Sequence, residues 1–115
     1  MNDPAELSVV ELALKCGVTG CVVWHPRQAE RVRKEMAKHR VTPELILIET
    51  VKHVQTCGFV LQVKETRPEY DHRVYYYKVI VPFASFAKGL FVEMELTDSD
   101  PEVPTVTLVN AHEQL

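Results

Sequence analysis

The sequence lacks several features that mark common classes of protein. No apolar run approaches the roughly 18 residues of a membrane-spanning helix, so no membrane association is expected. The first residues, MNDPAEL, do not combine a basic region with an apolar one and therefore do not predict a secretory signal. Three cysteines without a C-x-x-C pair indicate free thiols in a reducing compartment. We therefore expect a cytoplasmic protein.

Glycine is also scarce, which bears on cofactors. The chain has only four glycines and no G-x-G pattern, so neither a phosphate-binding loop nor a dinucleotide fingerprint is expected. No serine lies in a nucleophile-elbow motif. Cys16 and Cys21 have no second pair that would complete a structural zinc site, and the histidines show no ligand spacing. We predict neither a metal nor a cofactor.

Charge is unevenly distributed along the chain. The net charge is −3, yet one short segment holds six of the 13 basic residues: Arg27, Arg31, Arg33, Lys34, Lys38 and Arg40. Residues 93–115 contain acidic residues but no Lys or Arg. A polyanion would meet one attractive patch and a repulsive far end. The acidic net charge therefore argues against a protein that binds nucleic acid over much of its surface. The basic segment still allows nucleic-acid contact over a small area.

The N-terminal segment predicts a short helix. Ser8 and Glu11 have the spacing of a capping box, in which each side chain bonds the other residue's amide. A helix over about residues 9–16 should follow and end at Gly17, since glycine suits a left-handed C′ position. Residues 1–19 are therefore predicted to form a helical extension to the core.

Two further helices follow a short strand. The run CVVW predicts a strand that ends at His25-Pro26, and proline is readily accommodated at the first position of a helix. A helix over about 26–39 is expected. Thr42, a cap before another proline, predicts a third helix over about 43–54. Its wide apolar band predicts packing against a sheet over much of its circumference.

From residue 59 onward apolar and polar residues alternate, as in half-buried strands. Strands are predicted over 59–63, 73–81, 89–96 and 105–110, with 82–88 as a connection. Glu93 and Glu95 share one face and are expected to be solvated, and His112 is expected in a frayed tail. The pattern predicts an α+β fold with N-terminal helices packed on a four- to five-stranded, mainly antiparallel sheet. One domain, 1–115, should comprise the extension, a core over 20–110 and a tail over 111–115.

The basic helix has a distinct charged face. At about 100° per residue, four cations fall within an arc of about 60°: Arg27, Arg31, Lys34 and Lys38. Such a face can neutralise several phosphates of a nucleic acid. It is equally what a solvated helix presents, with Glu30–Lys34 and Glu35–Lys38 as weak ion pairs. The sequence leaves both interpretations open.

Four other residues are candidate contacts. His25 stands at a strand-to-helix junction, where an imidazole can act as a general acid or base or can cap the helix. Tyr76 and Lys78 share a strand face and can stack a base and contact its phosphate, or can serve as cross-strand neighbours of the glutamates. Thr107 lies on the last strand and can line the same surface.

The order of these pieces resembles a known group of proteins. A strand ends in His25, and the following helix carries arginine two and six positions further on. The next helix opens with Thr-Pro-Glu, a later strand is rich in tyrosine, and the last strand is VPTVTLV. Over about residues 20–110 this resembles the small bacterial domains related to the RelE, colicin-type and EndoU-type ribonuclease toxins, which share a fold of helices followed by an antiparallel sheet.

The resemblance implies metal-independent RNA cleavage, in which the 2′-hydroxyl attacks the adjacent phosphate. His25 would be the acid or base, and Arg31 would stabilise the phosphorane with Arg27. Thr107 or Tyr76 would position the substrate. The residues expected to bind RNA are Arg27, Lys34, Lys38, Tyr76 and Lys78.

A second hypothesis is a non-enzymatic interaction module. An open sheet edge, or the apolar segment 81–91, would bind a partner protein or a second copy of the chain. The two hypotheses differ in their expected response to salt, because RNA binding weakens steeply as salt rises.

Overall fold

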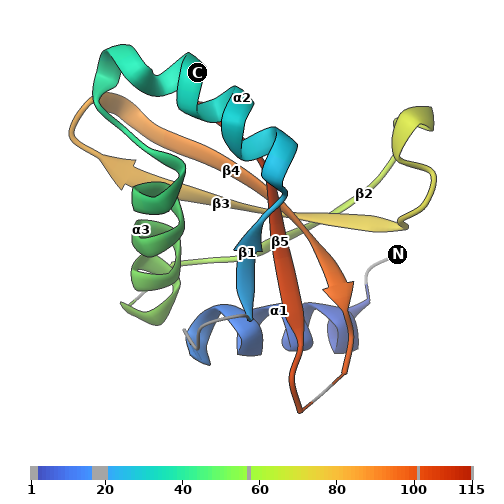
Figure 1. Ribbon diagram of the computed structural model, residues 1–115. Helices are drawn as coiled ribbons and strands as arrows, with labels where there is room; N and C mark the ends of the chain where they lie inside the picture. The colour runs from blue at the N-terminus through green and yellow to red at the C-terminus, as the bar shows by residue number, and fades with distance from the viewer. Residues whose placement is uncertain (1–2, 17–20, 57, 101, 115) are drawn as a thin grey trace.

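The chain folds with its helices first and a five-stranded sheet afterwards, as the computed structural model shows for residues 3–16, 21–56, 58–100 and 102–114 (Figure 1). The elements are α1 (Pro4–Cys16), β1 (Val22–Trp24), α2 (Pro26–Met36), the 3₁₀ turn η1 (Ala37–His39), α3 (Pro43–Thr56), β2 (Leu61–Lys64), the 3₁₀ turn η2 (Pro68–Tyr70), β3 (Tyr75–Phe83), β4 (Phe86–Asp98) and β5 (Thr105–Glu113). The predicted α+β class is confirmed.

The strands lie in the order β1-β5-β4-β3-β2. The last four in sequence form an antiparallel meander, and β1 joins its end by pairing in parallel with β5. The sheet is thus mainly antiparallel, as predicted. Because β1 lies beside β5, residues near position 25 are brought next to residues near position 108.

One face of the sheet carries the hydrophobic core. The fully buried residues of this face include Tyr77, Val79, Val92, Met94, Val106 and Leu108. α1 packs here, since the Tyr77 hydroxyl donates to the Glu6 carboxylate over 2.7 Å. α3 packs here too, since Trp24 Nε1 donates to the carbonyl of Pro43, also over 2.7 Å. The opposite face carries polar residues such as Lys78 and Glu93 as well as apolar ones such as Ile80 and Phe91.

α1 differs from its prediction in both start and role. Asp3, not Ser8, caps the helix, because the Asp3 carboxylate accepts from the Glu6 amide while the Ser8 hydroxyl bonds the Pro4 carbonyl inside the helix. The predicted capping box is therefore wrong, and Gly17 lies outside the described residues. Three side chains of α1 are fully buried: Val10, Ala13 and Leu14. α1 is part of the core and not an extension to it.

The next two helices begin where proline and threonine predicted. Pro26 opens α2, and the Thr42 hydroxyl accepts from the Leu45 amide at the start of α3. The apolar band of α3 is less covered than predicted, because Leu45 is 37% and Ile48 57% exposed. α3 has the sheet on one side only, so the outer half of the band faces solvent.

Two strand boundaries also need correction. Most of the predicted connection 82–88 belongs to β3 and β4, which form a hairpin turning at Ala84 and Ser85. The predicted tail is largely strand, since β5 runs to Glu113 and Ala111 is fully buried. His112 is not frayed, because its ring stacks on Phe91 with the ring centres 4.6 Å apart.

Candidate functional site

The sheet face opposite α1 and α3, here called the open face, carries a row of polar side chains. Strand register places Thr107 of β5 opposite Glu95 of β4, and Asn110 opposite Glu93. Glu93 in turn lies opposite Lys78 of β3. Opposed residues point to the same side of a sheet, so these side chains form one continuous polar surface.

His25 lies at the end of this surface, where β1 gives way to α2. Its amide donates to the carbonyl of Leu108 over 3.0 Å, which fixes it beside β5. Its Nδ1 accepts from the Gln28 amide over 3.4 Å, so the ring also caps α2. The ring is exposed, and within the described chain its Nε2 has no hydrogen-bond partner. Because Nδ1 accepts, the neutral ring carries its proton on Nε2, which is available to donate to a ligand while the cap is in place.

Arg31 reaches from α2 onto β5. Its Nη2 donates to Asn110 Oδ1 over 2.7 Å, and its Nη1 pairs with the Glu35 carboxylate over 3.0 Å. Its Nε donates to Gln28 Oε1 over 2.9 Å. The predicted solvated arc is therefore interrupted, because one of its four cations is anchored to the sheet.

All three predicted catalytic residues belong to or contact positions 107–110 of β5, His25 through its backbone amide and Arg31 through its side chain. Thr107 is part of this stretch, His25 is bonded to Leu108, and Arg31 is bonded to Asn110. The Thr107 hydroxyl also shares a 2.9 Å hydrogen bond with the hydroxyl of Thr97. Sequence reasoning missed Asn110, whose only signal was a polar residue after the apolar strand TVTLV.

The remaining cations of the helix face are free to meet a ligand. Arg27, Lys34 and Lys38 are exposed, and no ion pair involves them within the described chain. The ion pairs predicted for the lysines do not form. Glutamates pair with arginines instead, as Arg31–Glu35 and Arg33–Glu30. These three residues therefore form an uncompensated basic stripe beside His25.

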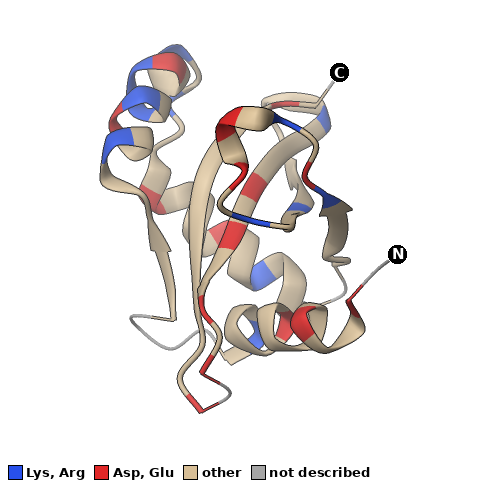
Figure 2. Ribbon diagram, turned by 90° about the vertical axis from the view of Figure 1, so that its right-hand side faces the viewer, with Lys and Arg blue, Asp and Glu red and all other residues tan. Residues whose placement is uncertain are grey.

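A second group of charges covers another part of the open face. The loop between β2 and β3 lies over β4, where basic and acidic residues meet (Figure 2). Its members, here called the buried cluster, are Glu65, Arg67, Arg73, Glu93 and Glu95. Arg73 bonds all three carboxylates, with 2.6 Å to Glu93 and 2.8 Å to Glu95. Arg67 bonds Glu65 over 2.8 Å and Glu93 over 3.0 Å.

Two tyrosine rings enclose the guanidinium groups of the buried cluster. Arg67 lies 4.5 Å from the ring centre of Tyr70 and 4.9 Å from that of Tyr76. Arg73 lies 4.4 Å from Tyr70 and 5.4 Å from Tyr76. These distances allow cation–π attraction, which strengthens where water is excluded. Tyr76 thus stacks on arginine, which corrects its assignment as an available base-stacking surface.

Burial and charge act together on the glutamates of this cluster. Glu93 is 3% exposed, so the prediction of solvated glutamates on this strand is wrong. Hydrogen bonding from Arg67, with a further contribution from Arg73, lowers the pKa of Glu65 to about 2. The cluster holds its carboxylates ionised and in fixed positions. Such a satisfied network anchors the loop more readily than it binds a ligand.

Lys78 belongs to neither group of arginines. Its Nζ lies 5.8 Å from the ring centre of Phe91 on the open face. β4 separates β3 from β5, so Lys78 and Tyr76 are two strand spacings, about 10 Å, from β5, and three spacings from β1, which precedes His25. The predicted RNA-binding residues therefore divide between two places.

Comparisons with known proteins give no indication of function, so a functional proposal must be based on the geometry described above. No protein family, curated protein or solved structure matches the chain. Among the described residues, no group of three or more His, Cys, Asp or Glu side chains is arranged to hold a metal ion. Nor does any helix in that part of the chain have the length and apolar character needed to span a membrane.

Proposed function

We propose that this chain binds single-stranded RNA along α2 and cleaves it at His25 without a metal ion. The observation that carries the proposal concerns residues 107–110 of β5, which include Thr107. They bond the His25 backbone and the Arg31 side chain, beside the basic stripe. The fold of helices followed by an antiparallel sheet agrees with the resemblance to toxin-type ribonucleases. That agreement supports the proposal at the level of architecture.

The chemistry needs a base, a positive charge and a positioned phosphate. The weak 3.4 Å cap from the Gln28 amide must first be released, so that His25 carries its proton on Nδ1. Nε2 then takes the proton of the RNA 2′-hydroxyl, and the 2′-oxygen attacks the adjacent phosphorus. The bond from phosphorus to the 5′-oxygen breaks, and that oxygen takes a proton from water. The products are a 2′,3′-cyclic phosphate and a free 5′-hydroxyl. Arg31 stabilises the extra negative charge of the phosphorane, and the Thr107 hydroxyl bonds a phosphate oxygen.

Arg31 is suited to this role because its ion pair is exchangeable. The side chains of Arg31 and Glu35 are 40% and 50% exposed, and exposed ion pairs contribute little net stability. A phosphate can therefore replace the Glu35 carboxylate at small cost. Asn110 keeps the guanidinium over β5 during the exchange.

The test is cleavage of a mixed structured RNA in EDTA. His25→Ala and Arg31→Ala should each lower the rate by about 100-fold or more, with 2′,3′-cyclic phosphate ends in the wild-type products. Arg33→Ala is the matched control, because Arg33 lies on the same helix in exposed ion pairs with Glu30 and Glu44. Its rate should stay near that of the wild type.

A binding measurement completes the test. Replacing Arg27, Lys34 and Lys38 together by alanine should flatten the log–log dependence of RNA affinity on salt by up to about 2, at about 0.7 per lost phosphate contact. Lys15→Ala on α1 should leave the slope unchanged. Absence of cleavage by the wild type in EDTA, or equal rates for wild type and His25→Ala, would refute the catalytic assignment.

A further inference from the structure

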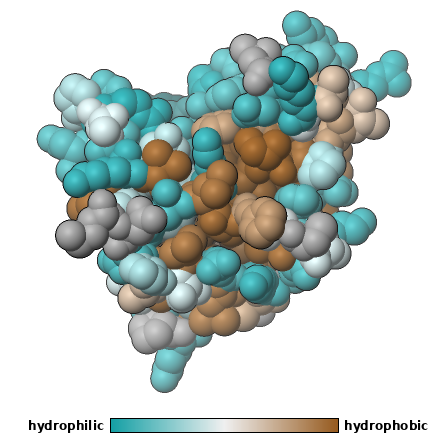
Figure 3. Space-filling view, turned by 180° about the vertical axis from the view of Figure 1, so that it is seen from behind, coloured by the Kyte–Doolittle hydropathy of each residue, from teal (hydrophilic) through white to brown (hydrophobic). Residues whose placement is uncertain are grey.

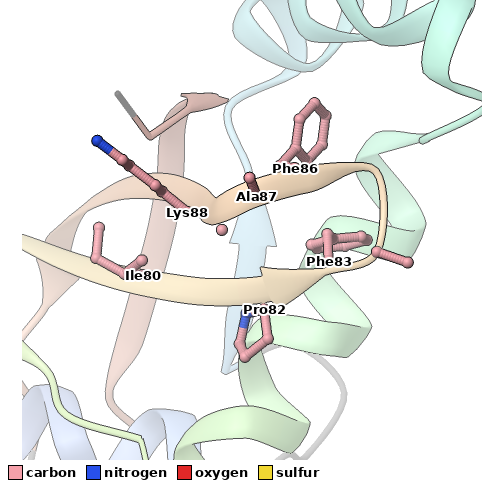
Figure 4. Close-up of a pocket in the computed structure, with 8 residues that line it drawn as sticks. Ile80, Pro82, Phe83, Phe86, Ala87 and Lys88 are labelled. Carbon is pink, nitrogen blue, oxygen red and sulfur yellow. The ribbon is translucent and has the colours of Figure 1, made fainter.

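The hairpin of β3 and β4 borders an apolar groove. A cavity of about 520 Å³ is lined by Ile80, Pro82, Phe83, Phe86 and Lys88, among others (Figure 4). Gly89 shapes it, because its φ of 85° is left-handed and an added Cβ would lie 2.9 Å from the Val81 carbonyl oxygen. This position thus requires glycine for the close approach of the two strands.

The groove continues toward β2 and α3. A second cavity shares Ile80 and adds Phe59, Leu61 and His53, and a third shares Pro82 and His53. Phe59 is 82% and Leu61 47% exposed, which is unusual for side chains of this size. From behind, apolar side chains gather in the middle of the molecule with hydrophilic residues around them (Figure 3). A contiguous apolar surface of this kind marks an interaction site.

The same surface ends in a free strand edge. β2 is the last strand of the sheet and pairs only with β3. The Glu65 amide donates to the Val74 carbonyl over 2.8 Å, so the backbone N–H of Glu65 points toward the β3 side of the strand. Along an antiparallel strand, the backbone N–H and C=O groups of successive residues point alternately toward and away from the neighbouring strand. The backbone groups of Gln62 and Lys64 therefore point away from β3. No backbone bond satisfies them within the described chain, so they can bond another strand. The Gln62 side chain meanwhile bonds the backbone of Asp3, which lies beside this end of β2.

The rim of the groove is basic although the chain is acidic overall. Lys52 and Lys88 line the cavities, Lys78 lies opposite Leu61 in the register, and Lys64 ends β2. Glu49 is the one acidic residue in the linings of these three cavities, within the described chain. Two copies of the chain meeting edge to edge would bring these lysines together, and like charges across strands are destabilising. Charge complementarity therefore favours an acidic partner.

We infer that β2 and the groove form a docking site for an extended segment of a partner protein in which apolar and acidic residues alternate. The segment adds to the sheet as a sixth strand, bonding the outward groups of Gln62 and Lys64. Its apolar side chains fill the groove around Leu61 and Ile80, and its carboxylates meet the lysines. The site is separate from His25 and does not depend on RNA cleavage.

The experiment titrates the full chain with a labelled decapeptide of alternating glutamate and valine, followed by fluorescence anisotropy. The same length of alternating lysine and valine is the charge control. Lys64→Pro removes the outward amide and the charge, whereas Lys64→Ala removes the charge alone. Proline is tolerated where the amide faces away from the sheet. The acidic peptide should bind, and Lys64→Pro should weaken it about tenfold more than Lys64→Ala.

If Lys64→Pro does not fold, amide hydrogen exchange on the unmodified chain tests whether the peptide docks on β2. Bound acidic peptide should slow exchange at Gln62 and Lys64, and Leu61→Ser should abolish that protection. Equal binding of the lysine peptide, or unprotected amides, would overturn the inference. Protection that appears without peptide as protein concentration rises would assign the edge to a second copy instead. RNA cleavage, or its absence, is measured separately and bears on His25 alone.

Discussion

Arg31 and Arg73 both bind carboxylates, but they do so in opposite surroundings. The side chain of Arg31, on α2, is 40% exposed. The side chain of Arg73, in the loop between β2 and β3, is 7% exposed. Arg31 has one carboxylate partner and Arg73 has three. The comparison teaches that an arginine–glutamate contact does not by itself indicate either structure or function. Its exposure determines whether the partner can be exchanged.

The difference follows from what lies on each side of the guanidinium. α2 stands beyond the end of β1, so water reaches its ion pairs and weakens them. The buried cluster lies between β4 and the rings of Tyr70 and Tyr76, where little water competes. Breaking a buried pair leaves an uncompensated charge, which is costly. One region is therefore suited to ligand exchange and the other to fixing a loop.

The largest expected effect comes from removing the centre of the buried cluster. Arg73→Met leaves Glu93 and Glu65 buried with fewer partners, and should lower the free energy of unfolding by about 3–5 kcal/mol. Urea denaturation at pH 7, monitored by Trp24 fluorescence, measures the loss. Arg33→Met is the matched control on α2, because its partners Glu30 and Glu44 are exposed. Its unfolding midpoint should move far less. Equal shifts for the two variants would mean that burial does not determine how much these arginine–glutamate pairs stabilise the fold.

A second prediction uses acid to weaken the same cluster. The pKa of Glu65 falls from its ordinary 4.5 to about 2 in the folded chain. A folded-state pKa below the unfolded value stabilises the fold above the unfolded value, so this contribution is present above pH 4.5 and is lost as the pH falls toward 2.

Glu65→Gln isolates that contribution. At pH 7 it should lower the free energy of unfolding by about 2 kcal/mol, because it removes a charged partner of Arg67 and Arg73. The variant should also lose less stability than the wild type between pH 4.5 and 2.5, as measured by urea midpoints across that range. An unchanged acid dependence would mean that other carboxylates control it.

Local sequence signals predicted the elements better than the contacts between them. Pro26 and Thr42 fix helix starts through their own backbone chemistry, so both were predictable. The burial of Glu93 was not predictable. A strand face covered by a loop has the same alternation of apolar and polar residues as a strand face in contact with water. The partner of Glu93, Arg73, lies 20 residues away in a segment without periodicity.

The candidate site was predictable to a similar degree. His25 and Arg31 were selected because the junction and the helix wheel are local features. Asn110 was missed because its bond to Arg31 spans 79 residues and depends on β1 pairing with β5. At the N-terminus the prediction chose Ser8 as the cap, but Asp3 caps α1, and the start at Pro4 gives the helix an additional turn.

The smallest expected effect tests whether the Arg31 pair is exchangeable. Glu35→Gln removes the carboxylate that competes with phosphate for Arg31, and should tighten RNA binding about threefold at low salt with little change in stability. Glu30→Gln is the control, since it removes an equal charge from the same helix but leaves Arg31 paired, and Arg33 keeps its pair with Glu44. If both variants tighten binding equally, the gain reflects net charge alone. A gain confined to Glu35→Gln would show that Arg31 receives the phosphate, which the locked geometry of Arg73 does not permit.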